Sequence, residues 1–245
     1  MKLHIADSYE RASGLAAAEV CRLVQAQPEA VLCFAAGDTP RLAYSLIVQK
    51  AREEQIDFSR ITFIGLDEWV GIPPENEGSC HYFLQENLIR PLGLMPAQVH
   101  LFDALSRDLS AETERLNQAV AHAGGLDLIL VGIGMNGHIG FNEPGIPFDS
   151  YAHVVELEAF TQEVGQKYFR TQTVLNQGIT LGLRHLTEAK QAILIANGLK
   201  KAEIVRQAIE GPVSPDVPAS VMRLHPGGLF LIEREAASAL HSSPA

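Results

Sequence analysis

The chain has 245 residues, of which 47% are hydrophobic and 20% charged, and its formal net charge is −10 at pH 7. This length and apolar share suit one globular domain with a full core, spanning residues 1–245. The acidic balance argues against nucleic acid or an anionic membrane surface as a partner, so an anionic substrate needs a local pocket of donors.

Membrane insertion and export are not expected. No run of 18 apolar residues occurs, and the N-terminal segment lacks the apolar core of a signal peptide. The three cysteines, Cys21, Cys33 and Cys80, have no metal-like spacing. These features predict a cytoplasmic protein without disulfides.

Strands and helices are expected to alternate along the chain. Strands are predicted at Lys2–Ala6, Ala30–Ala35, Ile61–Leu66, Val99–Phe102, Leu126–Val131, Val154–Leu157, Gly178–Leu181, Ala192–Ala196 and Leu229–Ile232. Helices are predicted at Tyr9–Gln25, Arg41–Glu54 after Pro40, Cys80–Leu88 after a Ser79 cap, Ser110–Ala123 with Ser110 as cap, and from Gly198 to Glu210. Without repeats or linkers, this order predicts an α/β fold: an open, mainly parallel twisted sheet with helices on both faces, Rossmann-like and three-layered. The tail after Glu235 is expected to fray.

The turn after the second strand is a candidate anion site. Gly37-Asp38-Thr39-Pro40 leads into a helix, whose free N–H groups and dipole favour a phosphate. A tight connection without a ligand is the alternative. Asp38 would add a second negative charge, so its side chain is expected to point away while its N–H faces inward. Lys200 and Lys201 begin a later helix against the usual dipole preference, which indicates either a local anion or a solvated pair.

Asp67 follows the third strand directly, and ligands of open α/β sheets bind outside the carboxyl ends of strands. It is a candidate general base for a proton next to a carbonyl, with a turn cap as the alternative. The side chain of the neighbouring Glu68 is expected to point in a different direction from that of Asp67 and to have a structural role.

The strand Leu126–Val131 opens into a glycine-rich loop that carries Asn136, His138 and Glu143. A histidine with a near-neutral pKa and a carboxylate partner is a competent proton shuttle, and Asn136 adds a neutral hydrogen-bonding group. A histidine satisfied by backbone is the alternative.

The same loop matches the dinucleotide pattern G-x-G-x-x-G from Gly132 to Gly137, with Glu156 in the place of the expected acid. No long helix follows the glycines, however, and the strand before them is not the first of the domain. Both points argue against a nicotinamide cofactor.

Two segments are similar to the signatures of the glucosamine-6-phosphate deaminase (isomerase) family, in its short non-allosteric form: LDEWVG at Leu66–Gly71 and GIGMNGHIGFNEPG at Gly132–Gly145. AGDTP at Ala36–Pro40 resembles the family's phosphate loop. Gly125–Pro144, taken with Gly178–Leu183, also resembles the galactosamine-6-phosphate branch. The resemblance extends over essentially the whole chain.

The resemblance implies conversion of an aminosugar 6-phosphate and water to a ketohexose 6-phosphate and ammonia, without metal or cofactor. Glucosamine 6-phosphate is the first expected substrate and galactosamine 6-phosphate the second. By resemblance, His138 opens the sugar ring with support from Glu143 and Asn136, and Asp67 moves the C2 proton to C1. Phosphate would be bound by Gly37, Asp38, Thr39, Lys167 and Lys201.

Three departures from the family pattern matter. Asn136 stands where the larger allosteric members have aspartate and the shorter members have asparagine, so activity is expected to survive. Tyr151 replaces a basic effector-site residue, so no activation by an N-acetylated sugar phosphate is expected. Lys167 stands where the family usually has an arginine, and a lysine loses the bidentate fork.

Several alternatives stay open from the sequence. A lactonase that acts on a 6-phosphogluconolactone shares the frame without needing Glu143, and a binding protein could keep the pocket without catalysis. Residues 156–177 are either a mobile lid or a plain surface helix. A monomer or a small homo-oligomer is expected, because no long apolar stripe is evident.

Overall fold

The computed structural model describes residues 1–241. Seven strands form one sheet in the order β1-β10-β9-β6-β2-β3-β5, and every neighbouring pair is parallel. The strands are β1 (Lys2–Ala6), β2 (Val31–Phe34), β3 (Thr62–Gly65), β5 (Val99–His100), β6 (Leu128–Val131), β9 (Gln191–Ala196) and β10 (Gly228–Glu233). β2 and β6 are apolar and buried throughout, as parallel strands covered on both faces require. The predicted α/β class and parallel sheet are confirmed.

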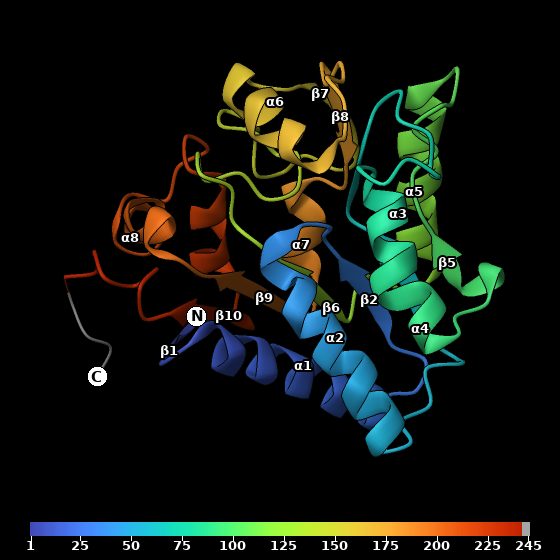
Figure 1. The fold of residues 1–245 in the computed structure, drawn as a ribbon, viewed down its shortest axis with the longest axis horizontal. Coiled ribbons are helices and arrows are strands. Elements are labelled where there is room, and N and C mark those ends of the chain that lie inside the picture. Colours follow the sequence, from blue (N-terminus) through green and yellow to red (C-terminus); the bar gives the residue numbers. More distant parts are fainter. Residues whose placement is uncertain (242–245) are drawn as a thin grey trace.

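Helices cover both faces of this sheet (Figure 1). Leu32 and Phe34 of β2 pack with one layer, while the alternating Val31 and Cys33 pack with the other. The first layer comprises α1 (Tyr9–Ala26), α2 (Asp38–Glu53), α3 (Cys80–Leu84) with its π-helical extension (Gln85–Ile89), and α4 (Arg90–Leu92). The second comprises α5 (Leu109–His122), α7 (Leu183–Glu188), α8 (Ala202–Glu210) and the 3₁₀ helix Pro218–Leu224.

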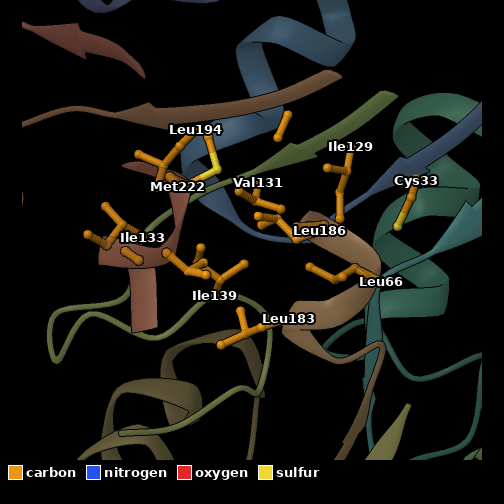
Figure 2. Packing of buried hydrophobic residues seen from close by; sticks show 14 of the residues in the cluster. Cys33, Leu66, Ile129, Val131, Ile133, Ile139, Leu183, Leu186, Leu194 and Met222 are labelled. Carbon is orange, nitrogen blue, oxygen red and sulfur yellow. The ribbon is translucent and has the colours of Figure 1, made fainter. Parts of the chain in front are cut away.

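Apolar side chains from the sheet and from the second helical layer pack together and form a core between them. Figure 2 shows Ile129, Val131 and Leu194 from the strands close to Leu186 of α7 and Met222 of the 3₁₀ helix. These residues are almost fully excluded from solvent. Within residues 1–241, no helix is both long and apolar enough to cross a membrane.

A second, three-stranded sheet was not anticipated. It joins β4 (Asp67–Trp69), β8 (Gln177–Thr180) and β7 (His153–Glu156) in antiparallel pairs. The helix α6 (Ala159–Gly165) and the 3₁₀ turn Gln166–Tyr168 connect β7 to β8, and all of them gather at one end of the molecule (Figure 1). The predicted strands near 154–157 and 178–181 therefore exist but lie outside the main sheet.

Two local expectations were wrong. Asp108, not Ser110, caps α5, because its side chain accepts the N–H of Ala111 at 2.9 Å and starts the helix at Leu109. The tail after Glu235 does not fray as a whole, since Ala236 and Ala237 are buried against the second layer. Residues 242–245 of that tail lie outside the described residues.

The strand order places a switch point at the centre of the sheet. From β2 the chain proceeds to β3 and β5 on one side, whereas from β6 it proceeds to β9 and β10 on the other. The loops after β2 and β6 therefore part, and a crevice opens outside the carboxyl ends of these strands.

Candidate active site

A cleft of about 460 Å³ lies at this switch point. Four neighbouring strands direct their following loops to it: β9 is followed by Lys201, β6 by His138, β2 by Gly37 to Thr39, and β3 by Asp67. Lys167 lines it from the 3₁₀ turn after α6. Of the predicted site residues, only Asn136 and Glu143 are not part of the lining. Both contact His138, Glu143 at the imidazole and Asn136 at the backbone N–H.

Asp67 is the first residue of β4 and lies in the floor of the cleft. Burial raises the pKa of its carboxyl to about 7; the neighbouring Glu68 carboxylate adds to this rise, and the Cys80 thiol opposes it. The Asp67 Oδ1 atom is buried without a hydrogen-bond partner among the described residues. A carboxylate with a pKa near neutrality and a free oxygen is suited to general base catalysis.

Glu68 has a structural place, as expected. Its carboxylate accepts the backbone N–H groups of Trp69, Cys80 and His81 at 2.7–2.9 Å. Burial raises its pKa to about 7, although these three donors oppose the rise. The bonds attach β4 to the start of α3 and so hold the neighbouring Asp67 in place.

His138 lines the cleft and pairs with Glu143, which does not line it. Its Nδ1 lies 3.4 Å from Oε2 of Glu143, and the Glu143 side chain is only 4% exposed against 22% for His138. Burial by itself would raise the pKa of Glu143, but contacts with His138, Thr161 and Asn136 hold it below its usual value. An ionised carboxylate at this position favours the tautomer with the proton on Nδ1 and leaves Nε2 as the other ring nitrogen.

Two glycines of the loop allow this arrangement. A Cβ at Gly134 would lie 2.3 Å from the His138 ring, so the imidazole rests directly on glycine backbone. Gly140 has a φ of +57°, and a Cβ there would lie 3.2 Å from Oδ2 of Asp67. The loop also leads to β7 without a long helix, unlike a dinucleotide-binding turn.

The candidate phosphate site is the N-terminus of the 16-residue helix α2, with Gly37 as N-cap. Lys201 approaches it from the 3₁₀ turn Leu199–Lys201, and its Nζ donates to the carbonyl oxygen of Ile133 at 2.5 Å. Burial, with help from the Lys167 charge, lowers the pKa of Lys201 to about 8. Lys200 is exposed and does not line the cleft.

Asp38 only partly follows the expectation that its carboxylate points away. The side chain is 56% exposed at the cleft rim, where Oδ2 lies 2.8 Å from Nζ of Lys167 and Oδ1 lies 3.3 Å from Arg41. Burial raises the pKa of Asp38, but the two cations outweigh it and leave a net lowering. Lys167 is thus already paired with an anion of the phosphate loop.

The segment around α6 forms one wall of the cleft, and the sequence did not single out most of its contributors. They are Phe160, Thr161, Val164 and Tyr168. Arg41, from the first turns of α2, also lines the cleft and lies over the ring of Phe83. None of these residues belongs to a short motif, and only their tertiary position marks them.

The family model for glucosamine-6-phosphate isomerases/6-phosphogluconolactonase matches residues 6–230. A glucosamine-6-phosphate deaminase of Lachnoclostridium phytofermentans is 39% identical over 227 residues, covering 92% of this chain and 96% of its own. One of Thermoanaerobacter pseudethanolicus is 36% identical over 239 residues, covering 97% and 94%.

Solved structures place the chain in the same group. A monomeric glucosamine-6-phosphate deaminase superposes with a TM-score of 0.94 at 36% identity, covering 98% of this chain and 100% of its own. A 6-phosphogluconolactonase from Trypanosoma brucei reaches a TM-score of 0.73 at 19% identity, covering 98% of each chain, and shows the shared fold alone. These similarities confirm the predicted resemblance, and the chain belongs to the family of glucosamine-6-phosphate isomerases and 6-phosphogluconolactonases.

Proposed function

We propose that this protein is a glucosamine-6-phosphate deaminase of the isomerising type, with galactosamine 6-phosphate as the second substrate to test. The observation that carries the proposal is one cleft lined by a carboxyl base, Asp67, by His138 with Glu143 paired to it, and by a helix N-terminus with a half-buried lysine. The relatives at 36–39% identity are deaminases, whereas the lactonase match is much more distant in sequence.

The first step opens the sugar ring. His138 takes the proton from the C1 hydroxyl and returns one to the ring oxygen O5, which breaks the C1–O5 bond and leaves an open-chain aldehyde. Glu143 stabilises the imidazolium that forms between the two transfers, as its lowered pKa and 3.4 Å contact with His138 support.

The second step moves a proton along the chain. Asp67 removes the C2 proton while the aldehyde oxygen O1 takes up a proton from water, which gives an enolamine. Asp67 then delivers its proton to C1, and the nitrogen releases a proton to water, which leaves an imine at C2. Water adds to that carbon, and loss of ammonia leaves the ketohexose 6-phosphate. A base with a pKa of about 7 suits both the removal and the return of the proton.

The side chains of the cleft supply each acid and base that these steps use, so we propose that the reaction proceeds without a metal or organic cofactor. Treatment with a chelator should leave the rate unchanged. We also propose a cytoplasmic enzyme that is a monomer or small homo-oligomer, and size-exclusion chromatography with light scattering tests the assembly state.

The decisive assay measures ammonia release from glucosamine 6-phosphate and galactosamine 6-phosphate side by side, with 6-phosphogluconolactone hydrolysis in parallel. Ammonia from either aminosugar supports the proposal, and the better substrate gives the C4 preference. Lactone hydrolysis without ammonia release would move the protein to the lactonase alternative. Tight phosphate binding without turnover of any substrate would indicate a binding protein.

Lys201 gives a prediction about substrate affinity and pH. Because its pKa in the free protein is about 8, the amine loses its charge as the pH rises through 8, and KM should then increase up to tenfold per pH unit. Lys201→Met should raise KM about 10- to 100-fold, with a smaller change in kcat, because a partly buried charged hydrogen bond to phosphate is lost. Steady-state kinetics from pH 6 to 9.5 check both effects; a KM without pH dependence in this range would contradict the assignment.

Asp38 gives a prediction of opposite sign. Asp38→Ser should lower KM about two- to fivefold, because it removes an anion from the phosphate loop and frees Lys167, while an exposed ion pair contributes little stability. Kinetics at low and moderate salt provide the measurement. An increased KM would show that the Asp38–Lys167 pair organises the phosphate site instead of competing with it.

A further inference from the structure

The side-chain amide of Asn136 bridges two carboxylates. Its Nδ2 donates to Oε2 of Glu143 at 2.7 Å and to Oε2 of Glu158 at 2.8 Å. Its Oδ1 accepts the backbone N–H of His138 at 3.3 Å. Both amide protons and the amide oxygen are therefore engaged, which ties Glu143 and the His138 backbone to a third group from another part of the chain.

Glu158 belongs to the segment that walls the cleft. It occupies the N-cap position of α6, the helix whose Phe160, Thr161 and Val164 line the cleft. Thr161 of the same helix lies near Glu143 and helps to lower its pKa, but its buried hydroxyl has no hydrogen-bond partner among the described residues. The start of α6 is thus attached to the His138–Glu143 pair through the Glu158–Asn136 hydrogen bond.

We propose that Glu158 is a positioning residue, which joins helix α6 of the cleft wall to the His138–Glu143 pair through the Asn136 amide. The position of helix α6 and the orientation of the Glu143 carboxylate then depend on each other. When the helix is packed in the cleft wall, Glu143 is held at contact distance from His138. The expected effects on kcat/KM rest on the proposed deaminase function. The structural coupling between helix α6 and the His138–Glu143 pair does not.

The chemistry of the bridge explains why a neutral amide stands at position 136. Two carboxylates can approach one atom only if that atom donates a proton to each, and an amide nitrogen has two protons to give. A carboxylate at this position would place a third negative charge about 3 Å from Glu143 and Glu158, where like charges disfavour one another. Asn136 and Glu158 should therefore depend on each other.

A double-mutant cycle in kcat/KM tests this dependence. Asn136→Asp should cost about 30-fold or more when Glu158 is present, but about threefold when Glu158→Gln is combined with it, since the glutamine amide can donate to the new carboxylate. Glu158→Gln by itself keeps an acceptor and should cost less than threefold, whereas Glu158→Ala should cost about 3- to 10-fold. An equal cost of Asn136→Asp in both backgrounds would overturn the proposal.

Hydrogen exchange of the peptide covering residues 159–168 gives a readout that needs no activity. Glu158→Ala and Asn136→Asp should each speed this exchange several-fold, and the Asn136→Asp/Glu158→Gln pair should return it toward the wild-type rate. Glu163→Ala, at an exposed position on the same helix, is the matched control and should leave coupling intact. If the wild type releases no ammonia, the proposed function fails, while the exchange data still decide the coupling; unchanged exchange in Glu158→Ala would overturn the inference.

Discussion

Asp67→Asn should reduce kcat about 10²- to 10⁴-fold while KM for the aminosugar phosphate changes little, because a general base contributes that much to a proton transfer. The amide has nearly the shape of the carboxyl but cannot accept the C2 proton. The phosphate loop lies at the end of a different strand, β2, so binding should persist.

The same base predicts the acid limb of the pH profile. Since burial raises the pKa of Asp67 to about 7, kcat/KM of the wild type should fall as the pH drops below 7, where the carboxyl becomes protonated. Asp7→Asn, at an exposed site that does not line the cleft, serves as the control. Solvent deuterium incorporation at C1 of the product gives a direct check: continued incorporation at the wild-type rate in Asp67→Asn would place the base elsewhere.

His138→Asn should lower kcat about 10²- to 10³-fold, because ring opening would then depend on the slow spontaneous reaction. Asparagine keeps a hydrogen-bonding group in the space above Gly134 but cannot exchange a proton near neutral pH. Added imidazole should restore part of the rate, since a free buffer can catalyse the opening of the sugar ring.

Glu143→Gln is compared with His138→Asn, because it leaves the imidazole in place and removes only the charge beside it. It should cost about tenfold, because the imidazole keeps its place but loses a charge that stabilises its protonated form. A loss in Glu143→Gln as large as that in His138→Asn, with no rescue by imidazole, would show that Glu143 has a role of its own in proton transfer.

Short-range signals in the sequence were sufficient for the framework of the fold. The apolar runs that became β2 and β6 predicted buried parallel strands, because strands covered on both faces typically lack polar alternation. The Ser79 cap is also confirmed by its 2.9 Å bond from the Tyr82 N–H. Asp108 and Ser110 are both suitable N-cap residues two positions apart, and the sequence analysis predicted Ser110 where the structure has Asp108.

The sequence pointed to the residues of the candidate site but not to their positions relative to one another. Motif resemblance singled out Asp67, His138 and Glu143, and the rule that ligands lie at the carboxyl ends of strands favoured the same loops. Their meeting point depends on the order in which β9, β6, β2 and β3 pair, which is a property of the whole sheet.

The sequence by itself determined the α/β class, the parallel strands and the residue types that carry the proposed chemistry, because hydrophobic period and local motifs act over a few residues. Only the tertiary structure decided which distant groups touch: β4 leaves the main sheet to pair with β8, Lys167 meets Asp38, and Glu158 meets Asn136. Such contacts leave no local signal, since they depend on how separate segments pack around a common core.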